Sequence, residues 1–140
     1  MALKDTIAAA LREPIAMLTR EFGMRVRLRR PEYTEAADGS TDMELVAVPG
    51  VSDTTLRVIV TSANIEALLQ EWGRESKAIL AVLATDAVPW QVDDVLYFRE
   101  GAHRGRYLEV VGVRATEPGG IVEMALREPG MDMTTLDKGF

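Results

Sequence analysis

The sequence predicts a mainly β fold: a small antiparallel β-barrel or sandwich with an N-terminal helix and one short inserted helix (α+β). Two observations support this prediction. Short apolar segments with strand-like alternation follow one another from residue 24 to residue 127, and Gly, Pro and Asp residues separate them. No strand is followed by the long crossover helix that a parallel sheet requires. The 140 residues suit one domain, expected over 1–129, with 130–140 as a flexible tail.

Residues 2–22 are expected to form the N-terminal helix. Six apolar residues recur there at three- and four-residue steps and share one helix face: Leu3, Ile7, Leu11, Ile15, Leu18 and Phe22. Pro14 interrupts this pattern, which predicts a kink or two abutting helices. Gly23 follows the last apolar position and is a suitable helix C-cap.

Residues 24–30 are expected to form the first strand, because apolar side chains alternate there with arginines. One face carries three apolar side chains, those of Met24, Val26 and Leu28. The opposite face, expected to lie in water, carries Arg25, Arg27 and Arg29. Pro31 should end the strand, and the polar, acidic stretch 31–41 is expected to be a loop. We expect residues 32–40 of this loop to be mobile in the free subunit.

The rest of the barrel, 24–128, is expected from further strands at residues 43–48, 54–61, 77–83, 94–98, 106–114 and 121–127. A short hairpin-like connection should join the strands 43–48 and 54–61. Between residues 62 and 72 the apolar spacing changes to helical steps, with Ser62 as N-cap and Gly73 as the stop. The predicted barrel core consists of Leu56, Val58, Val60, Ile79, Val95, Tyr97, Val110, Val113, Val122 and Met124.

The charges are unevenly distributed. The chain has 16 basic and 22 acidic side chains, a net charge of −6. Residues 1–30 hold seven basic and three acidic side chains (net +4), so residues 31–140 hold nine and 19 (net −10). This pattern suits docking against an acidic partner or head-to-tail self-assembly. The alternative is a solvated helix face followed by an arginine-bearing strand. Sequence-specific DNA binding is disfavoured, because an acidic body repels phosphates.

The sequence offers little catalytic chemistry, and we expect no enzyme, no cofactor and no metal site. It has no cysteine and one histidine, His103, in a Gly-flanked turn. The carboxylates of Asp93 and Asp94 should diverge, because neighbouring strand positions point to opposite faces. Trp72 and Trp90 are expected to be core or interface anchors, with a ligand-stacking pair as the alternative. No apolar run reaches membrane-spanning length, and no secretory signal is expected.

The back half of the chain resembles the small β-barrel of a phage protein family. The relevant stretch is VPWQVDDVLYFREGAHRGRYLEVVGVRATEPGGIVEMALRE. It contains an aspartate-led apolar strand, a Gly-containing turn, a second apolar strand, a Pro-Gly-Gly turn and a final alternating strand. The front half, in which EPIAMLTREFGMRVRLRRP runs directly into the first strand, is similar too. Over roughly residues 5–128, the chain resembles the head-completion (head-closure or stopper) proteins of tailed bacteriophages. The inserted helix 62–72 and the tail depart from the family pattern.

The resemblance implies a structural role in the neck of the virion, after assembly in the host cytoplasm. Such proteins form a ring, usually dodecameric, under the portal or its adaptor. The ring closes the DNA channel and docks the tail protein below, while DNA passes through without sequence-specific binding. No membrane is involved. An acidic lumen would let DNA slide, because like charges prevent contacts with phosphates.

Two segments are candidate partner interfaces. The first is the arginine strand with the acidic loop, including Arg25, Arg27, Arg29, Glu32, Glu35 and Asp38. The second is the C-terminal segment, expected to be a docking strand or hook outside the fold, with anchors at Met131, Met133, Leu136 and Phe140. Two other functions stay open: a phage tail-end or baseplate component, and a cytoplasmic barrel module that binds a small ligand or peptide near Trp72 or Trp90.

Overall fold

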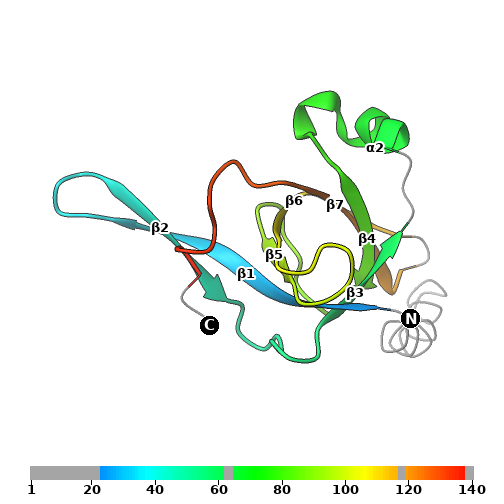
Figure 1. The fold of residues 1–140 in the computed structure, drawn as a ribbon, viewed down its shortest axis with the longest axis horizontal. Coiled ribbons are helices and arrows are strands. Elements are labelled where there is room, and N and C mark those ends of the chain that lie inside the picture. Colours follow the sequence, from blue (N-terminus) through cyan, green and yellow to red (C-terminus); the bar gives the residue numbers. More distant parts are fainter. Residues whose placement is uncertain (1–22, 62–64, 117–118, 138–140) are drawn as a thin grey trace, which may run out of the picture.

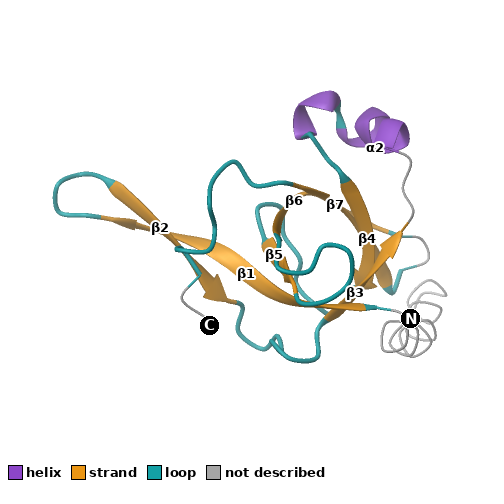
Figure 2. Cartoon of the chain, viewed as in Figure 1, coloured by secondary structure: helices purple, strands orange, loops and turns teal. Residues whose placement is uncertain are grey.

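The computed structural model describes residues 23–61, 65–116 and 119–137, so the predicted helix 2–22 lies outside the described residues. The fold is mainly β, as predicted (Figures 1 and 2). The described strands are β1 (Met24–Glu35), β2 (Thr41–Ala47), β3 (Arg57–Thr61), β4 (Leu80–Thr85), β5 (Val95–Phe98), β6 (Tyr107–Ala115) and β7 (Ile121–Arg127). Helix α2 (Ile65–Trp72) and the 3-10 turn η1 (Arg74–Ser76) connect β3 to β4.

Six of these strands close into an antiparallel barrel in the order β1-β3-β4-β7-β6-β5. The barrel closes where β5 pairs with β1, with Val26 opposite Phe98. Strand β2 lies outside the barrel, and its partner among the described strands is the second half of β1. The expected hairpin between β2 and β3 is therefore wrong: the two strands do not pair with each other, and each pairs antiparallel with a different part of β1.

The interior of the barrel is filled by alternate side chains from its strands, as a small closed barrel requires. Fully buried examples come from β1, β4, β5, β6 and β7: Leu28, Val82, Phe98, Leu108 and Met124. The predicted core positions Leu56, Val58, Val110, Val122 and Met124 are confirmed. Val60 and Val113 are partly buried against this core.

Three predicted core positions are wrong. Ile79 is 37% exposed, just before β4. Val95 and Tyr97 belong to a second apolar cluster on the outer face of the barrel, whereas Leu96 and Phe98 point inward. The reason is that β5 is apolar on both faces, so its alternation does not show which face is interior.

Strand β1 is longer than predicted, because Pro31 does not end it. β1 continues to Glu35 and forms a hairpin with β2 that projects beyond the barrel (Figure 1). Pro31 lies opposite Leu45, whose N–H points away from β1 and donates to the carbonyl oxygen of Leu136 at 2.8 Å. The pair is thus a non-hydrogen-bonded one, so the missing N–H of Pro31 removes no ladder bond. The turn around Gly39 replaces the predicted loop 31–41.

Helix α2 is confirmed, although Ser62, its predicted N-cap, lies outside the described residues. Leu68 of this helix is buried against three alanines on the outside of the barrel: Ala78, Ala81 and Ala125. Trp72 is partly buried in the same cluster. Because these side chains are small, α2 can lie close to β4 and β7. The short helix covers this outer face of the barrel.

The C-terminal segment is part of the fold through Asp137, so the prediction of a flexible tail over 130–140 is wrong for the described residues. Met133 and Asp137 are buried, and Asp137 forms a parallel bridge with Leu45 of β2. The segment crosses the outer face of the barrel and reaches the hairpin (Figure 1). Residues 138–140, and with them the predicted anchor Phe140, lie outside the described residues.

Candidate functional site

A buried polar cluster joins the C-terminal segment to the barrel. The Nε of Arg29 donates to Asp137 Oδ1 at 3.0 Å, and its Nη1 and Nη2 donate to the two oxygens of Asp53 at 2.7 and 3.0 Å. The Tyr107 hydroxyl donates to Asp137 Oδ2 at 3.0 Å. The hydrogen bonds that the Arg29 guanidinium donates, above all those to Asp53, raise the pKa of Arg29 above its ordinary value. The expectation that Arg29 lies in water is therefore wrong, because the C-terminal segment covers it.

Two more arginines of β1 are paired within the chain. Arg30 binds both oxygens of Asp94, at 2.8 and 3.1 Å. Asp94 is buried and also accepts the N–H of Gln91, whereas Asp93 is exposed, so the two carboxylates diverge as expected. The Nε of Arg25 lies 3.1 Å from Glu100 Oε2.

These pairs change the interpretation of the basic N-terminal region. Arg29 is inaccessible, Arg25 is only partly exposed, and Arg27 is of intermediate burial. Arg25, Arg29 and Arg30 are thus paired with carboxylates of the same chain. The excess of basic residues in the first 30 positions therefore gives little support for an arginine-lined docking face.

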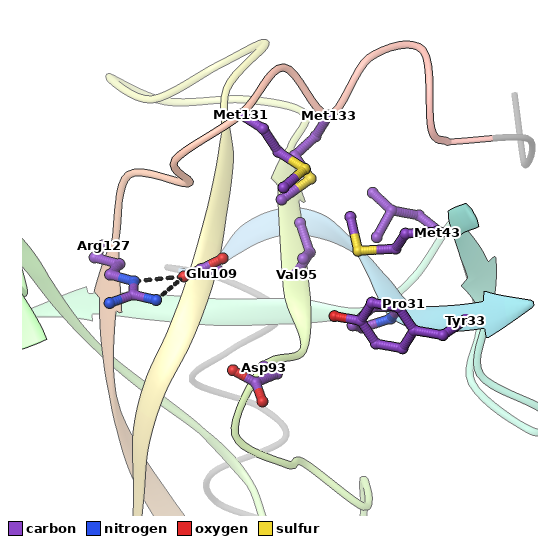
Figure 3. Close-up of a pocket in the computed structure, with 10 residues that line it drawn as sticks. Pro31, Tyr33, Met43, Asp93, Val95, Glu109, Arg127, Met131 and Met133 are labelled. Atoms are coloured by element: carbon purple, nitrogen blue, oxygen red, sulfur yellow. Dashed lines mark hydrogen bonds and ion pairs between the residues drawn. The ribbon is translucent and has the colours of Figure 1, made fainter. Parts of the chain in front are cut away.

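A cavity of about 210 Å³ lies where the hairpin, β5, β6 and β7 meet the C-terminal segment (Figure 3). Its lining is apolar on the hairpin side and polar toward β7: Pro31, Tyr33, Met43, Leu45, Asp93, Val95, Glu109, Arg127, Met131 and Met133. Strand register explains the hairpin side, because Pro31 faces Leu45 and Tyr33 faces Met43 across the ladder. These four side chains share the outer face of the hairpin with the buried Arg29.

Exposed apolar side chains gather around this cavity. The described residues expose four large hydrophobic side chains: Tyr33 (64%), Val92 (52%), Met131 (56%) and Ile79 (37%). Tyr33 and Met131 line the cavity, and Val92 directly precedes the lining residue Asp93. We call the cavity together with these three side chains the hairpin groove. Clustered exposed apolar groups of this kind mark interaction sites.

The polar side of the hairpin groove is mostly neutralised. Glu109 and Arg127 lie opposite each other on β6 and β7 and form an ion pair. Asp93 is held at a positive φ of 77° and leaves an exposed carboxylate at the rim. The groove can therefore receive apolar side chains and one or two polar contacts. The described residues contain no group of three His, Cys, Asp or Glu that could hold a metal ion.

The structure brings together only part of the predicted interface. Met131 and Met133 line the groove, and Leu136 packs against the cluster beneath it. The acidic residues of the other segment lie on the exposed part of the hairpin: Glu32, Glu35 and Asp38. Tyr33 is not among the predicted site residues, because the stretch 31–41 is expected to form a loop. Met43 begins the expected strand 43–48, but its partner across the ladder is not expected. Continuing the period-two pattern past Pro31 to the Asp38-Gly39 turn could have found them.

The two tryptophans do not form a ligand-stacking pair. Trp90 is buried in the barrel cluster, and its Nε1 donates to the carbonyl oxygen of Thr85 at 2.9 Å. Trp72 belongs to the separate cluster under α2. Both are packing residues, as expected. No helix among the described residues has the length and apolar character needed to cross a membrane.

The comparisons with known proteins bear on the fold. No family model matches the chain, and no curated protein matches it either. The chain is similar to protein SF1141 from Shigella flexneri 2a, known from a solution structure, with a TM-score of 0.58. The match covers 78% of this chain and 94% of that chain at 14% sequence identity. At this identity the likeness shows that the two chains share a fold, and it shows no more than that.

Proposed function

We propose that this protein is a structural subunit of the head-tail connector of a tailed phage, acting in a ring under the portal or adaptor. The observation that carries the proposal is the projecting β1–β2 hairpin, with an apolar groove at its base. A small barrel with a projecting hairpin suits a subunit whose function is to contact neighbours. The resemblance of the sequence to head-completion proteins points in the same direction.

The arrangement of polar groups favours binding over catalysis. The barrel interior is filled by apolar side chains. The buried polar residues Arg29, Asp94 and Asp137 are engaged in ion pairs that hold the fold together. The hairpin groove contains an ion pair and an exposed carboxylate, but neither histidine nor a serine–histidine arrangement. We therefore propose an assembly role and no enzymatic activity.

The exposed hairpin carries the charge that a DNA channel needs. Glu32, Glu35 and Asp38 are exposed on it, and no basic side chain lies between residues 31 and 56. If the hairpins of a ring pointed into the channel, they would repel the DNA backbone and let it slide. This is consistent with closure of the channel by the hairpins together.

A second candidate is a module that binds a peptide or a small ligand. The hairpin groove favours it, since a cavity of about 210 Å³ has room for a few apolar side chains. The groove lies outside the barrel, however, away from Trp90 and Trp72. The predicted tryptophan-lined site is therefore not the place where we expect this binding.

The deciding experiment is deletion and complementation in the phage or prophage that encodes the chain. Loss of the gene should leave DNA-filled heads without tails, visible by electron microscopy. The wild-type gene and an Ile79→Ser control should restore infectious particles, whereas a chain whose hairpin is cut back to a tight turn should not. Normal particles in the deletion strain, or the absence of portal and capsid genes from the same genome, would refute the proposal.

A further inference from the structure

We propose that the hairpin groove binds the N-terminal segment 1–22 of a second copy of this chain, so that copies associate head to tail. The inference deepens the proposed ring, but it concerns only contacts between copies. It can therefore be tested without a phage, a portal or a tail protein.

The groove is the place where the described surface is most apolar. Of the four large hydrophobic side chains that are exposed among the described residues, Tyr33 and Met131 line one cavity, and Val92 directly precedes its lining residue Asp93. Ile79 is not part of this groove. Beneath the other three lie Val95 and Met133, which are buried. A peptide with apolar side chains at regular spacing would cover the exposed ones and fill the cavity.

Residues 1–22 supply such a peptide. Their apolar residues recur at helical steps on one face, from Leu3 to Phe22. An amphipathic helix of this length is roughly 33 Å long and presents anchors at i, i+3/i+4 and i+7, the spacing used in helix-in-groove recognition. The segment has three basic and three acidic side chains, so it is neutral overall. A neutral helix suits a groove whose Glu109–Arg127 pair is itself neutral.

The geometry of β1 favours a second copy over the same chain. Segment 1–22 is followed by Gly23 at the start of β1, whereas Tyr33 lies on the projecting hairpin at the opposite end of that strand (Figure 1). The separation along the strand is roughly 30 Å for nine residues. A 22-residue helix folding back along its own β1 would be roughly 33 Å long, about the length of this separation. Only its first turn would reach the groove, whereas the helix of a second copy can use its whole face.

A contact of this kind is heterologous, because different surfaces of the two copies meet. Repeated around an axis it closes a ring, and without closure it gives an open chain. It therefore accounts for a ring without requiring any self-complementary face on the barrel.

Disulfide trapping tests the contact directly, because the chain has no cysteine of its own. A Leu11→Cys chain and a Met131→Cys chain, each full length, are purified separately, mixed and mildly oxidised. The mixed disulfide should form many-fold faster than that between Leu11→Cys and an Ile79→Cys control, because docking raises the effective concentration of the two thiols. Equal rates for the two mixtures would overturn the proposal. A monomeric Leu11→Cys/Met131→Cys chain that closes its own disulfide would also overturn it, in favour of self-docking.

Light scattering on full-length chains gives the second readout. The wild type should form oligomers as the concentration rises, and both Tyr33→Ser/Met131→Gln and Leu11→Asp should be monomeric with unchanged melting temperatures. Mixing these two variants should give 1:1 dimers, since one supplies the intact helix and the other the intact groove. A monomeric wild type, or variants that still oligomerise, would refute the contact. A chain that failed here but still restored phage particles would leave the connector role standing.

Discussion

Arg29 and Asp137 are 108 positions apart in the sequence, and they form an ion pair in which neither side chain is exposed to solvent. The pair attaches the last described residues of the chain to the first strand of the barrel. Asp53 binds the same guanidinium from the connection between β2 and β3. One arginine of β1 therefore holds both the β2–β3 connection and the C-terminal segment. Neither of these segments is part of the barrel ladder. Their alignment in turn positions the side chains beneath the hairpin groove.

Replacement of Asp137 should therefore destabilise the protein. Asp137→Asn removes one charge partner of Arg29 inside the fold and should lower the free energy of unfolding by about 3 kcal/mol, the lower end of the range for breaking a buried pair, because Asp53 remains. Urea denaturation measures this loss. Asp132→Asn, at an exposed position of the same segment, is the control: it keeps the oxygen that accepts hydrogen bonds from Thr134, so its urea midpoint should stay close to that of the wild type. Similar losses in both variants would mean that the segment is held by its apolar contacts alone.

The role of the C-terminal segment shows where sequence reasoning stopped. The sequence predicts Met131 and Met133 to be apolar anchors for a partner, but Met133 packs on the chain's own barrel and Met131 lines the groove beside it. A segment without periodicity looks the same in sequence whether it covers its own fold or that of a partner. The position of Asp137 opposite Arg29 depends on contacts between distant residues, which no local pattern encodes.

The barrel itself was largely predictable, because alternation and turn residues are local signals. Strand β7 was predicted at its observed bounds, and helix α2 followed from four apolar residues at helical spacing. Errors arose where two signals conflicted. Pro31 indicates the end of a strand, whereas the alternation continues through Tyr33, and in the structure the strand continues as well. The hairpin and the groove therefore do not follow from the proline signal. In β5 both faces are apolar, because Val95 packs on the outer face against residues of the second apolar cluster.

Truncation of an interior side chain should be costly, and truncation of the misassigned one should not. Leu108 is fully buried inside the barrel, so Leu108→Ala should cost about 2–5 kcal/mol through lost burial and the cavity left behind. Ile79 is partly exposed, and Ile79→Ala should cost clearly less, about 1 kcal/mol. Guanidinium denaturation of both variants provides the comparison. A larger loss of stability for Ile79→Ala than for Leu108→Ala would mean that Ile79 lies in the barrel core as predicted, and would contradict the structure.

Tyr107 should make stability fall at high pH. Burial, followed by its hydrogen bond to Asp137, raises the pKa of the phenol above its ordinary value of 10.0. The folded state therefore holds this proton more tightly than the unfolded chain. The resulting stabilisation is complete below pH 10 and is lost as the pH rises through the folded-state pKa.

The measurement is the melting temperature as a function of pH for the wild type and for Tyr107→Phe, which has no proton to lose. Above pH 10 the wild type should lose stability more steeply than the variant, so the difference between the two curves should change there. Absorbance of tyrosinate gives an independent readout, because the latest-ionising phenol should disappear in Tyr107→Phe. Parallel curves through this range would show that the Tyr107 phenol titrates equally in both states.

The contact between β6 and helix α2 leads to the last prediction. Gly112 lies at the bulge of β6, and a Cβ built there would come within 2.2 Å of Cε3 and Cζ3 of the Trp72 ring. Real Cβ atoms do not approach so closely, so Gly112→Ala must push Trp72 away and disturb the packing of α2. We expect a loss of about 1–3 kcal/mol, the usual cost of overpacking. The tryptophan emission spectrum should shift as well, because one of the two tryptophans changes its environment.

A double-mutant cycle separates this clash from a general intolerance of Ala in the strand. In a Trp72→Ala background the space beside Gly112 is open, so Gly112→Ala should be neutral or slightly stabilising, since glycine weakens strand interiors. Gly130→Ala is the matched control, because a Cβ at Gly130 meets no atom within 4 Å. It should leave both stability and emission unchanged. If Gly112→Ala were equally harmful with and without Trp72, the cost would lie in the backbone of the bulge, and the packing of α2 on β6 would not be what requires a glycine there.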